Sequence, residues 1–264
     1  MSINAFFPKR IVCLSHDSVE TLLALGAEAS IVGRPTGCRK EVLGHVATVG
    51  GYGHIDPEQV ASLKPELVIG YSDFHHDVVA ALVAKHITVL AQNHTTLAGI
   101  FQSILMLGGM TGRAIQAMSL VDDLKNTVET LVNKQRIGRR PRIYFEEWPE
   151  PATCGTRWIS EIIHAAGGED VFAERALNPG FAARTVTEDE VVRRDPEIIV
   201  ASWCGRKLHR EAMVSRPGWG NISAVKTDRI FEMRGSHILQ PGPRVIEGLQ
   251  KLHHIITAHF PEAG

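Results

Sequence analysis

Aromatic residues stand at the ends of several short apolar runs in this chain, and such runs are typical of buried strands. Aromatic residues are only 6% of the 264 residues, so their position at strand ends is a signal. Tyr and Trp combine a large apolar ring with one hydrogen-bonding group, which suits binding surfaces. Amide and basic groups also follow predicted strands. We therefore predict a site for a large, flat, amphipathic ligand. Its predicted contacts are Tyr52, Tyr71, Phe74, Gln92, Trp148, Trp203 and Arg234.

The sequence gives little support for catalytic residues. Glu146 and Glu147 follow a predicted strand, but adjacent strand residues point to opposite faces, so they do not form an acid–base pair. The stretch 50–53 (GGYG) lacks the lysine and following helix of a phosphate-binding loop. The hydrolase pattern GxSxG and the metalloprotease pattern HExxH are absent from the sequence. We therefore expect a binding protein and no enzyme.

Histidine and cysteine patterns do not indicate a metal site. Histidines are adjacent at 75–76 and 253–254, and because neighbouring helical residues point in different directions, such a pair rarely holds one metal ion. No CxxC pair argues for zinc or redox chemistry, and disulfide pairing stays open among Cys13, Cys38, Cys154 and Cys204. One histidine could still give an axial nitrogen to the metal of a bound cofactor; the candidates are His16, His54, His75 and His94.

The elements that position these residues are organised around residues 112–136. Apolar side chains recur there at spacings of three and four, which predicts a helix: Ile115, Met118, Val121, Leu124, Val128, Leu131 and Val132. A helix of this length would extend roughly 37 Å at about 1.5 Å per residue, which is suited to connecting two domains. We predict an N-terminal α/β lobe at 1–111, a connecting helix at 112–136 and a C-terminal α/β lobe at 137–264.

An internal similarity supports two lobes of one architecture. The segment 56–70 (DPEQVASLKPELVIG) matches 187–201 (TEDEVVRRDPEIIVA) at a constant offset of 131, and strands at Ile11 and Ile143 match at an offset of 132. Short apolar strands alternate with helices in both halves, which predicts parallel sheets covered on both faces. Ligands of such sheets lie beyond the carboxyl ends of the strands. That is where the candidate residues stand.

Most elements can be bounded from the sequence. The predicted strands are 10–14, 30–33, 65–70, 87–90, 142–145, 196–201 and 229–232. Besides 112–136, the predicted helices are 19–26 with Ser18 as its cap, 57–64, 75–85, 95–107, 157–166, 188–194 and 244–259. We expect residues 34–52, which are polar and glycine-rich, to form a loop.

Composition excludes several classes of protein. The net charge is -1 and the hydrophobic fraction is 44%, which is ordinary for a globular protein and gives no sign of a nucleic-acid surface. No apolar run approaches the roughly 18 residues of a membrane span. The first residues, MSINAFFPKRIVCLS, lack the pattern of a secretory signal. If Met1 is the native start, we expect a cytoplasmic protein.

The whole pattern resembles a known family. RIVCLS, ETLLALGAEASIVG, DPEQVASLKPELVIG and then one long helix resemble the substrate-binding proteins of iron-siderophore, haem and vitamin B12 ABC importers, which have the class III periplasmic-binding-protein fold. The similarity runs from Arg10 to about Phe260. Residues 144–172 and 239–252 look most like the cobalamin-binding branch.

The resemblance implies two Rossmann-like lobes with parallel sheets, joined by a single long α-helix, and a periplasmic monomer that holds cobalamin or a related corrinoid for an ABC permease. It implies corrin contacts from Tyr71, where the family carries Trp, and from Trp148 and Trp203. It also implies that Asp77 and Glu211 dock onto permease arginines. Cobalamin would be the ligand, and no catalytic cofactor is expected.

Two alternatives stay open. One is a cytoplasmic carrier or sensor of a corrinoid or tetrapyrrole on the same fold. The other is a ferric-siderophore or haem-binding protein. Siderophore sites need several basic groups, and the arginines near predicted strand ends are Arg34, Arg206 and Arg234, which favours a corrinoid.

Overall fold

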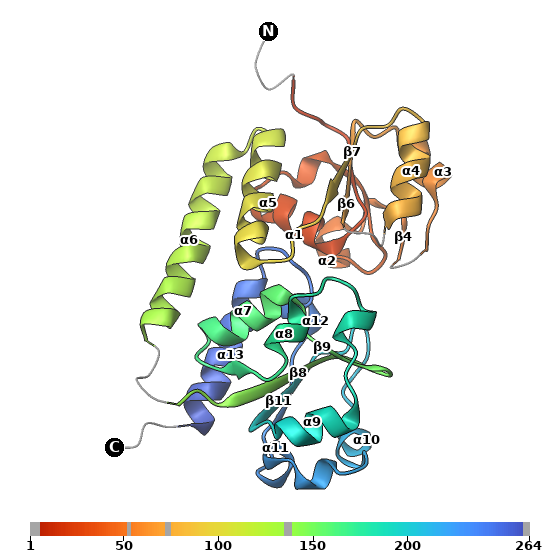
Figure 1. Cartoon of the computed structure of the whole chain (residues 1–264). Coiled ribbons are helices and arrows are strands. Elements are labelled where there is room, and N and C mark those ends of the chain that lie inside the picture. The colour runs from red at the N-terminus through yellow and green to blue at the C-terminus, as the bar shows by residue number, and fades with distance from the viewer. Residues whose placement is uncertain (1–5, 52–53, 72–74, 135–138, 261–264) are drawn as a thin grey trace. The chain divides into compact units, whose positions relative to one another are not determined.

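The computed structural model describes residues 6–51, 54–71, 75–134 and 139–260 (Figure 1). The chain forms two compact units, of which the first contains residues 1–94 and 98–123 and the second contains residues 95–97 and 124–264. The boundary between them falls inside one long helix, α6 (Ala114–Asn133). The fold class is therefore α/β, with two lobes built on parallel sheets and joined through a long helix, as predicted.

The first unit is built on a five-stranded parallel sheet in the order β3-β2-β1-β6-β7. The strands are β1 (Ile11–Cys13), β2 (Ile31–Arg34), β3 (Ala47–Thr48), β6 (Leu67–Tyr71) and β7 (Val89–Gln92). All of β6 is buried, as expected for an inner strand covered on both faces. The helices are α1 (His16–Ala24), α2 (Lys40–Leu43), α3 (Pro57–Ser62), α4 (His76–Ala84) and α5 (Leu97–Met110), and β4 (Gly50–Gly51) pairs with β5 (His54–Ile55).

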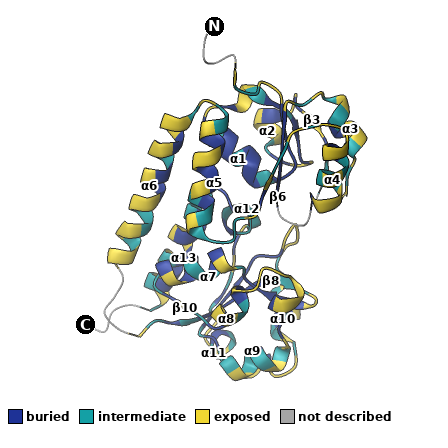
Figure 2. Cartoon of the chain, turned by 45° about the horizontal axis from the view of Figure 1, so that its top comes forward, coloured by how far each residue is buried: buried dark blue, intermediate teal, exposed yellow. Residues whose placement is uncertain are grey.

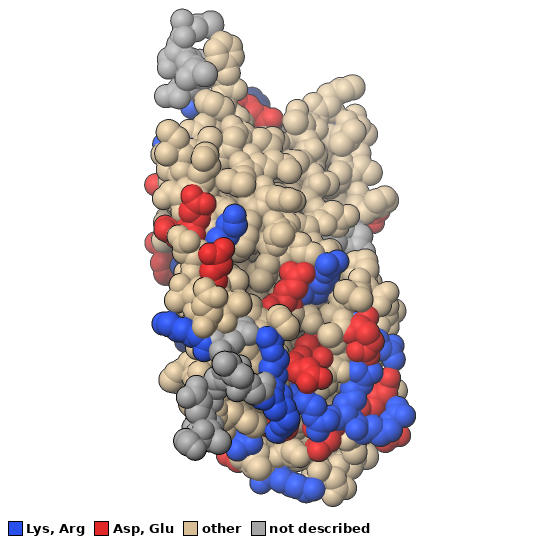
Figure 3. All heavy atoms as spheres, turned by 60° about the vertical axis from the view of Figure 1, so that its left-hand side comes forward, with Lys and Arg blue, Asp and Glu red and all other residues tan. Residues whose placement is uncertain are grey.

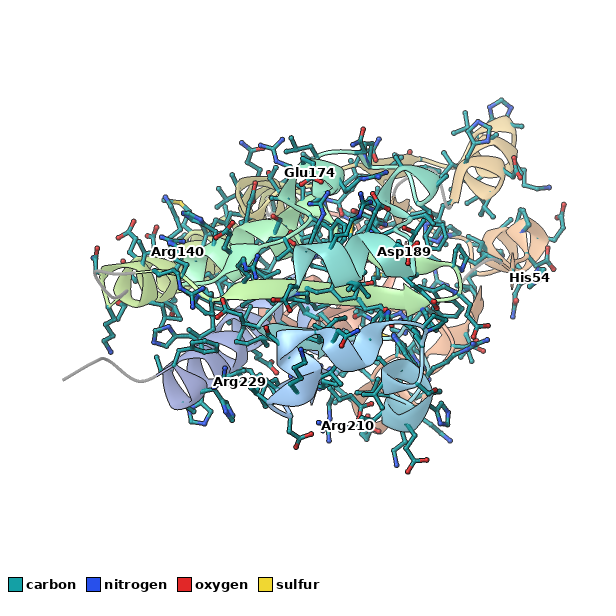
Figure 4. The ribbon with its side chains drawn as sticks, turned by 60° about the horizontal axis from the view of Figure 1, so that its bottom comes forward. His54, Arg140, Glu174, Asp189, Arg210 and Arg229 are labelled. Carbon is teal, nitrogen blue, oxygen red and sulfur yellow. The ribbon has the colours of Figure 1, made fainter. Side chains whose placement is uncertain are left out.

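The second unit has a parallel sheet in the order β10-β8-β11-β12, with β9 antiparallel to β8. The strands are β8 (Arg142–Pro149), β9 (Ala152–Cys154), β10 (Glu169–Asp170), β11 (Ile198–Ala201) and β12 (Ile230–Glu232). The helices are α7 (Arg157–Ala165), α8 (Ala173–Ala176), α9 (Glu188–Arg194), α10 (Arg210–Val214), α11 (Ser223–Lys226), α12 (Gly235–Ile238) and α13 (Val245–His259). Glu174 of α8 and Asp189 of α9 lie on one side of β8, and Arg210 of α10 lies on the other (Figure 4), so helices cover both faces.

The predicted repeat is confirmed by the strand register. Ile11 faces Leu67 in the first sheet, and their counterparts Ile143 and Ile198 face each other in the second. The helices before β6 and β11 also begin alike. The Asp56 carboxylate accepts a hydrogen bond from the Glu58 backbone N–H at 2.9 Å, and α9 opens with a capping box at Thr187.

Two expectations need correction, and the exposure of part of α6 is a further finding. The helix α1 begins before Ser18, which is buried and donates through Oγ to the Ser15 carbonyl at 2.8 Å; Ser15 takes the extended N-cap conformation instead. Residues 34–52 are not one loop, because they contain α2, β3 and β4. The apolar stripe of α6 does not all face inward, since Ile115 and Met118 are 81% and 60% exposed (Figure 2).

Close packing of α5 and α6 explains that last difference. A Cβ atom on Gly108 would lie 2.3 Å from the Ala117 Cβ, so the two helices meet at small residues and the Ala117 side of α6 turns inward. Ile115 and Met118 then face outward, as do Leu105 and Met106 of α5. In the space-filling view, uncharged atoms cover most of the visible surface of the first unit (Figure 3).

Candidate ligand-binding site

Tyr71 is held firmly at the carboxyl end of β6. Its backbone N–H donates to His75 Nδ1 at 3.0 Å, and its hydroxyl donates to the His94 carbonyl at 2.8 Å. The ring meets the His94 ring edge-on, with centroids 5.1 Å apart, and the residue is only 9% exposed. The Tyr71 hydroxyl is therefore already used within the protein, and a ligand would contact the edge of a ring that is held in place.

The neighbouring strand β7 ends in Gln92, which is buried. Its Nε2 donates to Ser103 Oγ of α5 at 2.5 Å, while its Oε1 has no hydrogen-bond partner among the described residues. A buried acceptor without a partner costs about 1 to 3 kcal/mol, so this oxygen is suited to receive a donor from a ligand. The predicted contacts Tyr52 and Phe74 lie outside the described residues.

The candidate histidines differ in their surroundings. His75 is buried and His16 is half-buried, and burial lowers the pKa of both imidazoles. Both are therefore neutral at physiological pH, which a metal ligand requires. His94 packs on Tyr71, and His54 is exposed on β5. Within the described residues, no three His, Cys, Asp or Glu side chains form a group that could hold a metal ion.

Asp17 is a buried carboxyl group at the carboxyl end of β1, in the first turn of α1. Burial raises the pKa of Asp17 from 3.8 to about 6, although a hydrogen bond from Ser15 acts in the opposite direction and lowers it. Because the folded state binds this proton more tightly than the unfolded chain, Asp17 stabilises the fold below about pH 4 and loses that contribution as the pH rises through about 6.

We expect Asp17→Asn to raise the free energy of unfolding at pH 7.5 by on the order of 1 to 2 kcal/mol. The gain should shrink as the pH falls and vanish near pH 4, where Asp17 is protonated in both states. Urea unfolding of wild type and variant across this pH range measures the difference. Asp189→Asn is the control, because Asp189 occupies the first turn of α9 but is exposed. A gain that is independent of pH would contradict the assignment.

In the second unit, a buried carboxylate organises the carboxyl ends of β8 and β11. Glu146 is 0% exposed and accepts hydrogen bonds from Tyr144 Oη at 3.0 Å, Trp203 Nε1 at 2.9 Å, and Arg216 Nη1 and Nη2 at 2.6 and 3.1 Å. Burial raises the pKa of Glu146, and these donors oppose the rise. The predicted contact Trp203 is thus 8% exposed, with its N–H engaged inside the protein.

Trp148 is the more accessible of the two predicted tryptophans. It lies near the end of β8 and is half-buried, and its Nε1 donates to the Glu150 carbonyl at 2.9 Å. The guanidinium of Arg206 covers its ring, with Cζ 4.6 Å from the centroid. Arg234 is exposed just after β12. Arg34 is buried and donates to the carbonyl groups of Leu43 and Pro35, so it is not available to a ligand.

The two predicted docking acids occupy similar places in the two units. Asp77 lies in the first turn of α4, the helix that follows β6, and Glu211 lies in the first turn of α10, which follows β11. Both are exposed. Asp77 approaches His76 at 3.1 Å, but both side chains are largely in solvent, so this contact does not remove the charge from the surface.

All four cysteines are free thiols, and Cys204 is the exposed one. Glu147 pairs with Arg184 at 2.5 Å. A surface hollow of the second unit contains none of the predicted site residues; it is lined by Arg157, Ser160, Glu161, Ala173, Glu174 and Leu177. Among the helices of the described ranges, none is long and apolar enough to cross a membrane.

Neither Arg216 nor the buried hydrogen-bonding role of Glu146 was predicted from the sequence. Arg216 is 70 positions from Glu146 in the chain, and neither residue belongs to a recognisable motif. The one available signal was that Glu146 directly follows the apolar run 143–145.

Comparisons with known proteins agree with this architecture. The model of a family described as periplasmic binding protein matches residues 11–236. An uncharacterized ABC transporter substrate-binding lipoprotein of Bacillus subtilis (strain 168), YvrC, is 28% identical over 93% of this chain and 79% of its own length. A cobalamin-binding protein of Halobacterium salinarum (strain ATCC 29341 / DSM 671 / R1) is 23% identical over 93% and 68%. The periplasmic heme-binding protein RhuT from Roseiflexus sp. RS-1 shares the fold, with a TM-score of 0.81 at 21% identity over 95% and 98%.

Proposed function

Because this chain belongs to the periplasmic binding protein family, we propose that it captures cobalamin or a related corrinoid and delivers it to an ABC importer. The family consists of substrate-binding transport proteins and not of enzymes. Its members act in the periplasm or as lipoproteins outside the cytoplasm, and we propose the same compartment for this protein.

The half-buried indole of Trp148 carries the proposal. It stands at the carboxyl edge of a parallel sheet, where ligands of α/β folds bind, and Trp203 lies at the end of the adjacent strand β11. A corrin ring offers a broad flat face with amide groups on its rim, which suits indole faces and an unpaired acceptor such as Gln92 Oε1. The proposed contacts remain Tyr52, Tyr71, Phe74, Gln92, Trp148, Trp203 and Arg234.

A heme is the second candidate. Burial keeps His16 neutral by lowering its pKa, and a neutral imidazole nitrogen can bind heme iron. His75 is less suited, because its Nδ1 already accepts a hydrogen bond from the Tyr71 N–H, which leaves the proton of the neutral ring on Nε2. A ferric siderophore has less support, because Arg34 is buried and donates its hydrogen bonds to the carbonyl groups of Leu43 and Pro35.

Ligand titration separates these candidates. Cyanocobalamin, hemin and a ferric siderophore are added separately to the protein, and tryptophan fluorescence and the melting temperature are followed. The expected result is quenching by cyanocobalamin with a gain of about 2.7 kcal/mol in stability at 100 times the dissociation constant. Binding of hemin alone, with a shifted Soret band, would establish the second candidate. No change with cyanocobalamin would reject the corrinoid proposal.

Delivery to a permease needs a docking surface. We propose that Asp77 and Glu211, which are exposed on corresponding helices of the two units, supply one carboxylate each. Because both carboxylates are exposed, they can reach basic side chains of a permease.

A further inference from the structure

We propose that Arg206, lying across the indole of Trp148, selects ligands that carry a phosphate or carboxylate group on the rim of their flat ring system. This inference rests on the proposed function, because it assigns a chemical preference to the same site. The two kinds of ligand share one feature, which is a negatively charged group with two oxygen atoms at the edge of a macrocycle. In a corrinoid it is the phosphodiester of the nucleotide loop, and in a heme it is a propionate.

The Trp148 indole, on which Arg206 lies, is held in place by a hydrogen bond. The Trp148 N–H points to the Glu150 carbonyl at 2.9 Å, so the indole cannot turn freely. The Arg206 Cζ lies 4.6 Å from the ring centroid, which is within the range of a cation–π contact. A stacked guanidinium keeps its N–H groups in the plane parallel to the ring, where they can still donate to a second molecule.

A tight turn brings Arg206 back toward β8. The chain leaves β11, and the Arg206 backbone N–H donates to the Trp203 carbonyl at 3.2 Å. Gly205 takes the left-handed conformation, with φ +70°, inside this turn, which a glycine adopts without strain. Because β8 and β11 are neighbours, with Ala201 facing Glu146, the turn places the arginine over the tryptophan of the next strand.

The charge of Arg206 is not satisfied within the protein. Among the residues that the structure describes, no carboxylate forms an ion pair with it, and its side chain is exposed. Two acids of β8 are already engaged: Glu147 pairs with Arg184 at 2.5 Å, and Glu146 pairs with Arg216 at 2.6 Å. Two other stacked arginines of this unit differ. Arg194 lies over Phe172 but also pairs with Glu174, and Arg216 lies over Trp219 but also pairs with Glu146.

A guanidinium without a carboxylate partner at a candidate ligand edge is suited to bind two oxygens of one anion side by side. The indole behind it limits its motion and so reduces the ordering cost of that contact. Lysine would keep the charge but lose the planar stacking and the paired donors.

The test compares anionic and non-anionic forms of each ring system. Wild type, Arg206→Gln and Arg206→Lys are titrated with cyanocobalamin and with dicyanocobinamide, which lacks the phosphodiester. They are also titrated with hemin and with hemin dimethyl ester. Arg229→Gln is the matched control, because Arg229 stacks on Phe260 at 4.4 Å but precedes β12, at the amino end of the sheet (Figure 4).

We expect Arg206→Gln to weaken binding of the anionic form by about 10-fold and that of its uncharged counterpart by less than about 2-fold. Arg206→Lys should recover only part of the loss, and Arg229→Gln should change neither affinity. Equal losses for both forms, or no loss, would overturn the inference while leaving the proposed function intact. If the wild-type protein binds none of the four ligands, both are overturned together.

Discussion

Arg216→Met is expected to lower the free energy of unfolding by about 3 to 5 kcal/mol, because it leaves a buried carboxylate without its counter-charge. Glu146 is 0% exposed, and Arg216 supplies two of its hydrogen bonds, at 2.6 and 3.1 Å. The remaining donors, Tyr144 and Trp203, are neutral. Two neutral hydrogen bonds do not offset the desolvation of a carboxylate.

Urea unfolding at pH 7 to 8 measures this loss, and the design contains its own controls. Arg194→Met removes an arginine that also stacks on an aromatic ring, at 4.1 Å, but its partner Glu174 is 58% exposed, so a loss of at most about 1 kcal/mol is expected. The double variant Glu146→Gln/Arg216→Met should recover much of the stability, since no buried charge remains. If Arg216→Met and Arg194→Met lower the free energy of unfolding equally, the burial of Glu146 does not contribute to the loss.

The same variant should depend on pH with a defined sign. Burial already raises the pKa of Glu146, and loss of Arg216 raises it further. A carboxyl group whose pKa is raised in the folded state stabilises the fold at low pH and loses that contribution as the pH rises. The deficit of Arg216→Met relative to wild type should therefore be smaller at pH 5 than at pH 8.

Trp148→Ala is expected to weaken cobalamin binding by about 3 kcal/mol, or about 150-fold, which is the size expected for a central aromatic contact. Its effect on stability should stay small, because the indole is half-buried and its N–H bonds only to the nearby Glu150 carbonyl. Calorimetric titration with cyanocobalamin and urea unfolding measure the two effects separately.

Trp203→Ala provides the comparison. Trp203 is 8% exposed and its N–H donates to Glu146, so we expect a loss of stability of about 3 kcal/mol or more together with weaker binding. If Trp148→Ala binds cobalamin like the wild type, Trp148 is not part of the site, and the proposal loses its main support.

Much of the fold could be predicted because each signal is local. Apolar runs such as 67–71 are strands in the structure, and Pro57 with Asp56 marks the start of α3. The constant sequence offset between the two halves is also seen in the strand pairing, where Ile11 faces Leu67 in one sheet and Ile143 faces Ile198 in the other. Such features depend on neighbours in the chain or on repetition of one pattern.

The rest could not be predicted because it depends on distant residues. Ile115 and Met118 face solvent since Gly108 and Ala117 bring α5 and α6 together, and nothing in the periodicity of α6 reveals that contact. The sequence correctly indicated that Trp203 follows the end of a strand, whereas Trp148 lies inside β8, which continues to Pro149 instead of ending at Phe145. The sequence did not indicate that the Trp203 indole would donate to a buried carboxylate, since Glu146 lies 57 positions away and is paired with Arg216, a further 70 positions from Glu146.

Because only one of its thiols is exposed, the protein can be labelled with a fluorescent dye at a single position. Three of its four free cysteines are buried, and the exposed one, Cys204, directly follows Trp203. A maleimide dye would therefore attach at a single position beside the candidate site without any engineered cysteine or removal of native ones. Its emission would report on whatever occupies that edge of the sheet, which allows a library of coloured and colourless compounds to be screened in one format.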